Sequence, residues 1–191
     1  MITASSSRPI GDPSELQPGF YVPRAGAPGF YAASYVAVSV LYLARFVVAL
    51  PWSISSMVVS VLTAATADDP CDVGIYDATA DPLTLVSHAG STSGKLNAVG
   101  NQSFPLLAPA SLSAARVYYA ALFYSAVGGS AASLAALVSN VAAPGYALFG
   151  STPPAVEGAY CTPGGSVCPS TIACATTTAL TGSIPLLALH T

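Results

Sequence analysis

Few side chains in this chain could do chemistry, and their spacing matches no common catalytic pattern. His88 and His190 are the two histidines, and neither has a carboxylate at an informative distance along the sequence. An isolated histidine at a strand end, facing solvent, carries no mechanism by itself. A Ser-His-Asp arrangement stays open because triad members need not be adjacent, but the GxSxG elbow that often accompanies it is absent. We therefore expect no enzyme activity and name no catalytic residue.

Four cysteines raise the question of a disulfide or a metal site. Cys161, Cys168 and Cys174 follow one another with six and then five residues between them, and Cys71 lies far upstream. Zinc sites favour paired CxxC knuckles, so this spacing gives little support to metal binding. A disulfide between Cys161 and Cys168 would close a glycine-rich loop, whereas buried free thiols are the alternative for a chain that stays in the cytosol.

Carboxylates gather in one segment, DDPCDVGIYDATAD, at residues 68–81. This segment lacks the ordered oxygen ligands and the terminal Glu of an EF-hand loop, so it reads as an acidic edge rich in turns. Calcium held by several loops together stays open. Phosphate-binding GxGxxG and Walker patterns are also missing, and we expect neither a metal nor a cofactor.

Charge is scarce throughout the sequence. Five basic and eight acidic residues give a net charge of -3, and charged residues make up only 7% of a chain that is 53% hydrophobic. No basic stripe exists that could neutralise phosphates, which argues against nucleic acid as a partner.

A membrane protein is the main competing class, because residues 31–65 hold a single charge. Against a spanning helix, Arg45 would lie inside it, Pro51 would break it, and β-branched and aromatic residues are frequent. No flanking Lys/Arg cluster would orient a span. Residues 1–11 also lack the apolar run of a secretory signal. We therefore expect a protein that is made in the cytoplasm, and these features disfavour a membrane protein.

Glycine and proline, 16 of each, divide the apolar sequence into many short elements. Residues 116–127, RVYYAALFYSAV, are apolar on both faces, which predicts a central strand covered on both sides. The expected fold is an all-β, jelly-roll-like antiparallel sandwich. Strands are expected at residues 35–50, 52–65, 71–78, 83–88, 95–104, 116–127, 146–149, 171–180 and 184–190, with a strand or short helix at 131–139, a break at 105–109 and a loop at 151–170.

Residues 1–34 form an expected Pro/Gly-rich extended arm, and residues 35–191 form the sandwich domain. Proline at five positions before residue 30 opposes both a helix and a central strand. Isolated apolar residues in this arm look like anchors for another surface, and a disordered tail is the alternative. The anchors are Phe20, Tyr21, Val22, Phe30 and Tyr31.

Four sequence stretches are similar to the small jelly-roll domains of tailed-phage virion proteins, which belong to tail fibres, tail tips or head surfaces. They are CDVGIYDATADPLTLVSHAGS, ARVYYAALFYSAVGG, GYALFG and GSIPLLALHT. The resemblance implies a non-enzymatic structural protein of the virion that forms a homotrimer and contacts other virion proteins. It covers about residues 35–191 and rests on pattern and not on reactive residues.

Taken together, these observations predict a tail module docked on the particle by its arm. A capsid decoration protein, a small membrane protein and a free carbohydrate-binding or hydrolytic sandwich are the alternatives. Loops at residues 89–102 and 151–170 are where a host-surface glycan would bind, with Tyr160 as a contact. The apolar composition further predicts surfaces buried between identical subunits.

Overall fold

The chain folds into two antiparallel sheets. The computed structural model describes residues 30–34, 39–48, 50–125, 128–139, 158–179, 182–185 and 187–191. Sheet A contains β1 (Phe30–Ser34), β3 (Trp52–Thr63), β6 (Gly100–Leu112), β8 (Ser133–Ser139), β12 (Gly182–Pro185) and β13 (Leu187–His190).

Sheet B carries the remaining strands and is the more fully covered of the two. A short 3-10 helix, η2 (Cys174–Thr176), lies between its last two strands in sequence. The strands are β2 (Val40–Val48), β4 (Cys71–Asp77), β5 (Leu83–His88), β7 (Arg116–Tyr124), β9 (Gly158–Cys161), β10 (Thr171–Ile172) and β11 (Thr178–Ala179).

The order of the first eight strands is that of a jelly roll. Sheet A has β1-β8-β3 with β6 on the other side of β3, and sheet B has β5-β4-β7-β2. Most successive strands therefore alternate between the sheets, as two Greek keys require. The last strand of the chain is divided, because β12 pairs with β8 and β13 pairs with β3. The expected all-β jelly roll is confirmed.

The main core lies between the sheets, and its side chains follow the strict alternation of β-strands. On β4, Cys71, Val73 and Ile75 face this core, and Phe46 stacks on Tyr118 with ring centroids 5.7 Å apart. Burial of apolar side chains between the sheets is the largest stabilising contribution in such a fold.

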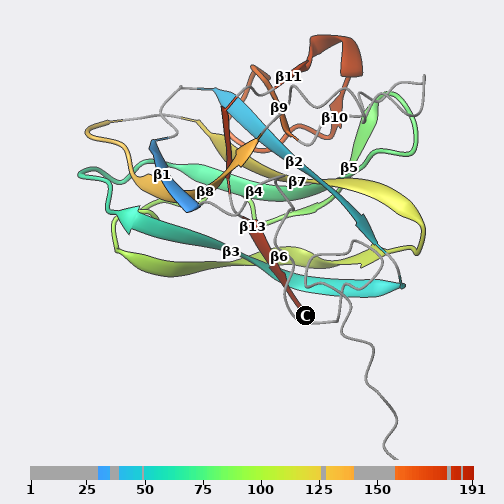
Figure 1. The fold of residues 1–191 in the computed structure, drawn as a ribbon, viewed down its shortest axis with the longest axis horizontal. Coiled ribbons are helices and arrows are strands. Elements are labelled where there is room, and N and C mark those ends of the chain that lie inside the picture. Colours follow the sequence, from blue (N-terminus) through green and yellow to red (C-terminus); the bar gives the residue numbers. More distant parts are fainter. Residues whose placement is uncertain are drawn as a thin grey trace, which may run out of the picture.

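A second, smaller core lies on the outer face of sheet B. Leu41 and Leu43 of β2 and Tyr119 and Phe123 of β7 point into it. Residues 161–174, called the covering segment below, complete it with Cys161, Cys168, Ile172 and Cys174. Figure 1 shows β3 and β6 below, β4 and β7 above them, and β9 to β11 on top. The prediction that residues 116–127 form a central strand covered on both sides is confirmed for β7.

Three expectations about single elements were wrong. The break expected at 105–109 lies inside β6, where Pro105 pairs with Ser56 and the register shifts beside it. Proline is tolerated there because β6 pairs with β3 and with no other described strand, as on a sheet edge. The loop expected at 151–170 contains β9, and the strand expected at 171–180 is two short strands around η2.

The expected arm overlaps the first strand of the jelly roll. Phe30–Ser34 forms β1 and pairs with β8 over five residues. Residues 1–29 and the strand expected at 146–149 lie outside the described residues. Within those described, no helix has the length and apolar character needed to cross a membrane.

Candidate functional site

A buried carboxylate is the most unusual polar group of the molecule. Asp72 lies on β4 between two residues that face the main core, so the strand alternation turns it to the outer face of sheet B. It is completely buried. Its Oδ2 accepts the backbone N–H of Cys168 at 2.9 Å and lies 2.8 Å from His88 Nδ1, which donates when it carries the proton.

This group ties three segments together. The antiparallel pairing of β4 with β5 sets Gly74 opposite His88, and thereby brings Asp72 beside the His88 ring. The Cys168 backbone belongs to the segment that covers the second core. Nearby, the Tyr76 hydroxyl donates to the carbonyl oxygen of Pro169 at 2.8 Å. Sheet B thus holds its covering segment by two side-chain hydrogen bonds, of which the one from Cys168 to Asp72 is buried.

Asp72, His88 and Cys168 resemble a catalytic set in composition but differ from one in arrangement. The carboxylate lies between the histidine and the cysteine, whereas a nucleophile needs its base as a direct neighbour. Burial and the Asp72 carboxylate raise the pKa of the Cys168 thiol well above its usual value. A thiol kept protonated in this way is a poor nucleophile.

The disulfide between Cys161 and Cys168, one of two possibilities that the sequence left open, is not formed in this structure, where both residues are free and buried. Cys168 faces β4, since a Cβ added to Gly74 would lie 3.2 Å from its Sγ. The thiols of Cys71 and Cys174 are free as well. Burial raises the pKa of Cys71 and of Cys161 to about 11. All four cysteines are therefore buried free thiols, which is the other possibility that the sequence left open.

The expected anchor and glycan-binding residues are only partly described. Phe30 and Tyr31 are in β1, with their backbones paired to β8. Tyr160 is in β9, opposite Tyr42 on one side and Thr178 on the other. The anchors Phe20, Tyr21 and Val22 lie outside the described residues. Docking by the arm and glycan contact by Tyr160 stay predictions.

A shallow hollow of about 340 Å³ lies at the turn between β4 and β5. At its rim, Asp77 accepts hydrogen bonds from Thr79 and, at 3.0 Å, from the Arg116 guanidinium. Burial works to raise the pKa of Asp77, but these hydrogen bonds outweigh it and the pKa is lowered. The hollow contains one carboxylate, which is hydrogen-bonded, and no aromatic ring. Its lining residues are Asp77, Thr79, Ala80, Pro82, Thr84 and Val86.

The acidic residues before β4 close turns. Asp69 Oδ1 accepts the backbone N–H of Gly128 at 2.6 Å, and Asp68 accepts from the Asn97 side-chain amide. In the part of the chain that the structure describes, no group of three His, Cys, Asp or Glu side chains is placed to hold a metal ion. The hydrogen bonds of Asp68 and Asp69 agree with the interpretation of this segment as an acidic edge rich in turns.

Sequence reasoning missed the partner of His88. The expectation of a solvent-facing histidine without a carboxylate was wrong, because its side chain is only 25% exposed and lies against fully buried Asp72. Sixteen residues separate the two in sequence. Pairing residues 71–78 with 83–88 as a hairpin would have placed them near each other, although a bulge between Ile75 and Tyr76 changes the register.

Comparison with protein-family models finds no matching family, and a search of curated proteins finds no match.

Proposed function

We propose that this chain is a non-enzymatic structural protein of a virion, a jelly-roll module that assembles with copies of itself. The observation that carries the proposal is the strand order, β1-β8-β3-β6 in one sheet and β2-β7-β4-β5 in the other. Viral capsid domains are among the main users of the jelly roll, together with lectins and cupins. A fold does not decide function alone, so the sites must be weighed as well.

The described residues favour assembly over chemistry. Buried side chains of both sheets form the main core, Asp72 holds the backbone of Cys168 by a hydrogen bond, and the free thiols are buried. Large apolar side chains stand in solvent instead, with Leu107 72% and Leu50 65% exposed. Together with so little charge, such a surface fits a subunit that buries it against neighbours.

For the position on the particle, the tail is the first candidate and the head surface is the second. The sequence resemblance includes head-surface proteins as well as tail proteins, and the eight-strand order is one that capsid domains use. In this proposal the chain contributes to the particle surface. Residues 1–29 then dock it onto the particle, and the neighbours are further copies and other virion proteins.

Purification of the full chain tests the proposal. Size-exclusion chromatography with light scattering and negative-stain electron microscopy should show a defined oligomer or closed particles. Deletion of residues 1–29, which leaves β1 intact, should lower incorporation into particles. A full chain that stays monomeric at high concentration would contradict self-assembly, and normal incorporation of the truncated chain would contradict docking by the arm.

A further inference from the structure

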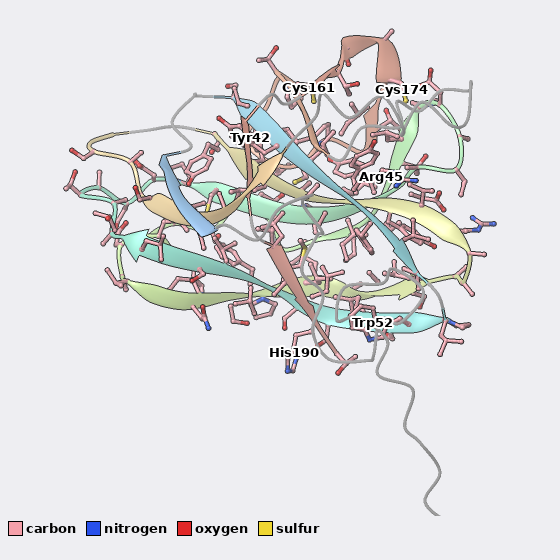
Figure 2. The ribbon with its side chains drawn as sticks, in the orientation of Figure 1. Tyr42, Arg45, Trp52, Cys161, Cys174 and His190 are labelled. Carbon is pink, nitrogen blue, oxygen red and sulfur yellow. The ribbon has the colours of Figure 1, made fainter. Side chains whose placement is uncertain are left out.

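The charges of this protein are distributed unevenly between its two sheets. None of the six strands of sheet A contains a Lys, Arg, Asp or Glu, whereas Arg45, Asp72, Asp77 and Arg116 all lie on sheet B. The other charged residues within the described ranges are in loops. Figure 2 places Arg45 on the upper side of the molecule and His190, the one histidine of those six strands, on the lower side.

The outer face of sheet A is therefore a neutral surface. On β3, Trp52, Ile54, Met57, Val59 and Val61 are buried in the main core, so the residues between them face outward. Leu62 is 45% exposed there. We call this surface the neutral face, and it consists chiefly of Ser53, Ser55, Val58 and Leu62 of β3 with Ser103 and Pro105 of β6.

A partner would meet this sheet on its face and not along the β6 edge. Within the described residues β6 hydrogen-bonds to β3, which leaves its other side without a paired strand. An unprotected edge of 13 residues would invite strand addition. Pro105 and Pro109 lack the N–H group that an added strand needs, and the register shift disturbs the ladder between them.

We infer that the neutral face packs against the same face of a second copy. Removing a charged group from water without a partner is costly, so a neutral surface is best matched by another neutral surface. Sheet B, with its charged residues, is a poorer partner for it. Two copies of the neutral face bring no like charges together and leave no charge unpaired.

The neutral face lies on two neighbouring strands and is of limited size. Twelve residues of β3 extend over about 40 Å, and two strands are about 10 Å wide, which gives a flat area on the order of 400 Å². Its accessible area is larger because side chains roughen it. Stable interfaces bury about 800 Å² on each partner, so this face by itself supports a weak, reversible contact.

This inference rests on the proposed function, since it names the surface through which copies meet. The test places a charge on the neutral face with Leu62→Glu and, separately, Ser103→Glu, in the full chain. The matched control is Val86→Glu, which puts the same charge at an exposed apolar position on sheet B. Light scattering measures the oligomer, and circular dichroism melts confirm that each variant is folded.

We expect both neutral-face variants to lower the assembled fraction at least tenfold, and Val86→Glu to assemble like the wild type. Ser103→Glu keeps the test decisive if Leu62→Glu fails to fold, since it changes a small exposed side chain.

The outcomes separate the two proposals. A wild-type chain that is monomeric overturns the proposed function. If the wild type assembles and the folded neutral-face variants assemble equally well, or if Val86→Glu dissociates to the same extent, the neutral face is not the contact.

Discussion

Asp72 is the residue whose environment most constrains this fold. Its fully buried carboxylate accepts hydrogen bonds from β5 and from the segment that covers the second core. A buried carboxylate is stable only while its partners remain, and those partners would be unsatisfied without it. The covering segment should therefore depend on Asp72 for its attachment.

Replacement of Asp72 by alanine should lower the free energy of unfolding by about 3 kcal/mol, because a backbone N–H and an imidazole would lose their acceptor inside the protein. Urea denaturation monitored by circular dichroism measures this. Asp81→Ala is the matched control, since exposed Asp81 accepts one backbone N–H, from Cys174, at 2.9 Å. The control should lose about 1 kcal/mol or less. Equal losses of unfolding free energy in the two variants would show that burial of the Asp72 carboxylate does not increase its contribution to stability.

The buried thiols predict instability in alkali. The folded-state pKa of Cys71 is raised from 9.0 to about 11, so the folded protein keeps a proton that the unfolded chain releases. This stabilising contribution is complete below pH 9 and is lost as the pH rises toward 11. For one such thiol the full loss is on the order of 2 to 3 kcal/mol.

Urea denaturation at pH 8, 9 and 10 should show a falling free energy of unfolding, with a shallower fall in Cys71→Ala. Burial raises the pKa of Tyr119 from 10.0 to about 12, so its contribution begins only as the pH approaches 10, where the unfolded tyrosine releases its proton, and the lower part of this range reports mainly on thiols. The same profile in the wild type and in Cys71→Ala would contradict this assignment.

At the scale of elements, the contact between β4 and the covering segment depends on a glycine. A Cβ at Gly74 would lie 3.1 Å from Leu85 Cδ1 and 3.3 Å from the Ser87 carbonyl oxygen, and close to Cys168 Sγ. The first atom belongs to a side chain that can move, whereas the second is backbone within the sheet. Close packing on this side of β4 therefore requires a residue without a side chain.

Gly74→Ala should destabilise the protein by about 1 to 3 kcal/mol through overpacking. Gly164→Ala is the control, because nothing lies within 4 Å of a Cβ added there, and its effect should be near zero. Thermal melts of both variants, followed by circular dichroism, provide the comparison. A Gly74→Ala variant as stable as Gly164→Ala would mean that Leu85 and the covering segment yield easily.

Strand prediction succeeded where the signal is local. Residues 83–88 and 116–124 alternate or run apolar between clear turn residues, and both are strands. It failed at β6, where two prolines suggested a break, because tolerance of proline depends on which strand lies alongside. Strand prediction also assigned the residues of β1 to the extended arm, because the pairing of β1 with β8 joins residues about a hundred positions apart.

For the whole molecule, the neutral face predicts an assembly that is insensitive to salt. Ionic screening acts on charged contacts, and this contact has none. The assembled fraction should change less than twofold between 50 and 500 mM NaCl in light-scattering measurements at constant protein concentration. Dissociation at the higher salt would indicate that charged groups outside sheet A form the interface.

The sequence by itself determined the class of fold, the scarcity of reactive groups and the fact that charge is rare. These properties follow from composition and from periodicity over a few residues. The tertiary structure decided what lies together: Asp72 with His88 and Cys168, a second core on the outer face of sheet B, and the separation of all sheet charges onto that sheet. The two partners of Asp72 lie 16 and 96 positions away from it in the sequence. Strand order and register bring these residues together, and local sequence patterns encode neither. The few polar and charged side chains of this chain therefore acquire their roles only through the fold.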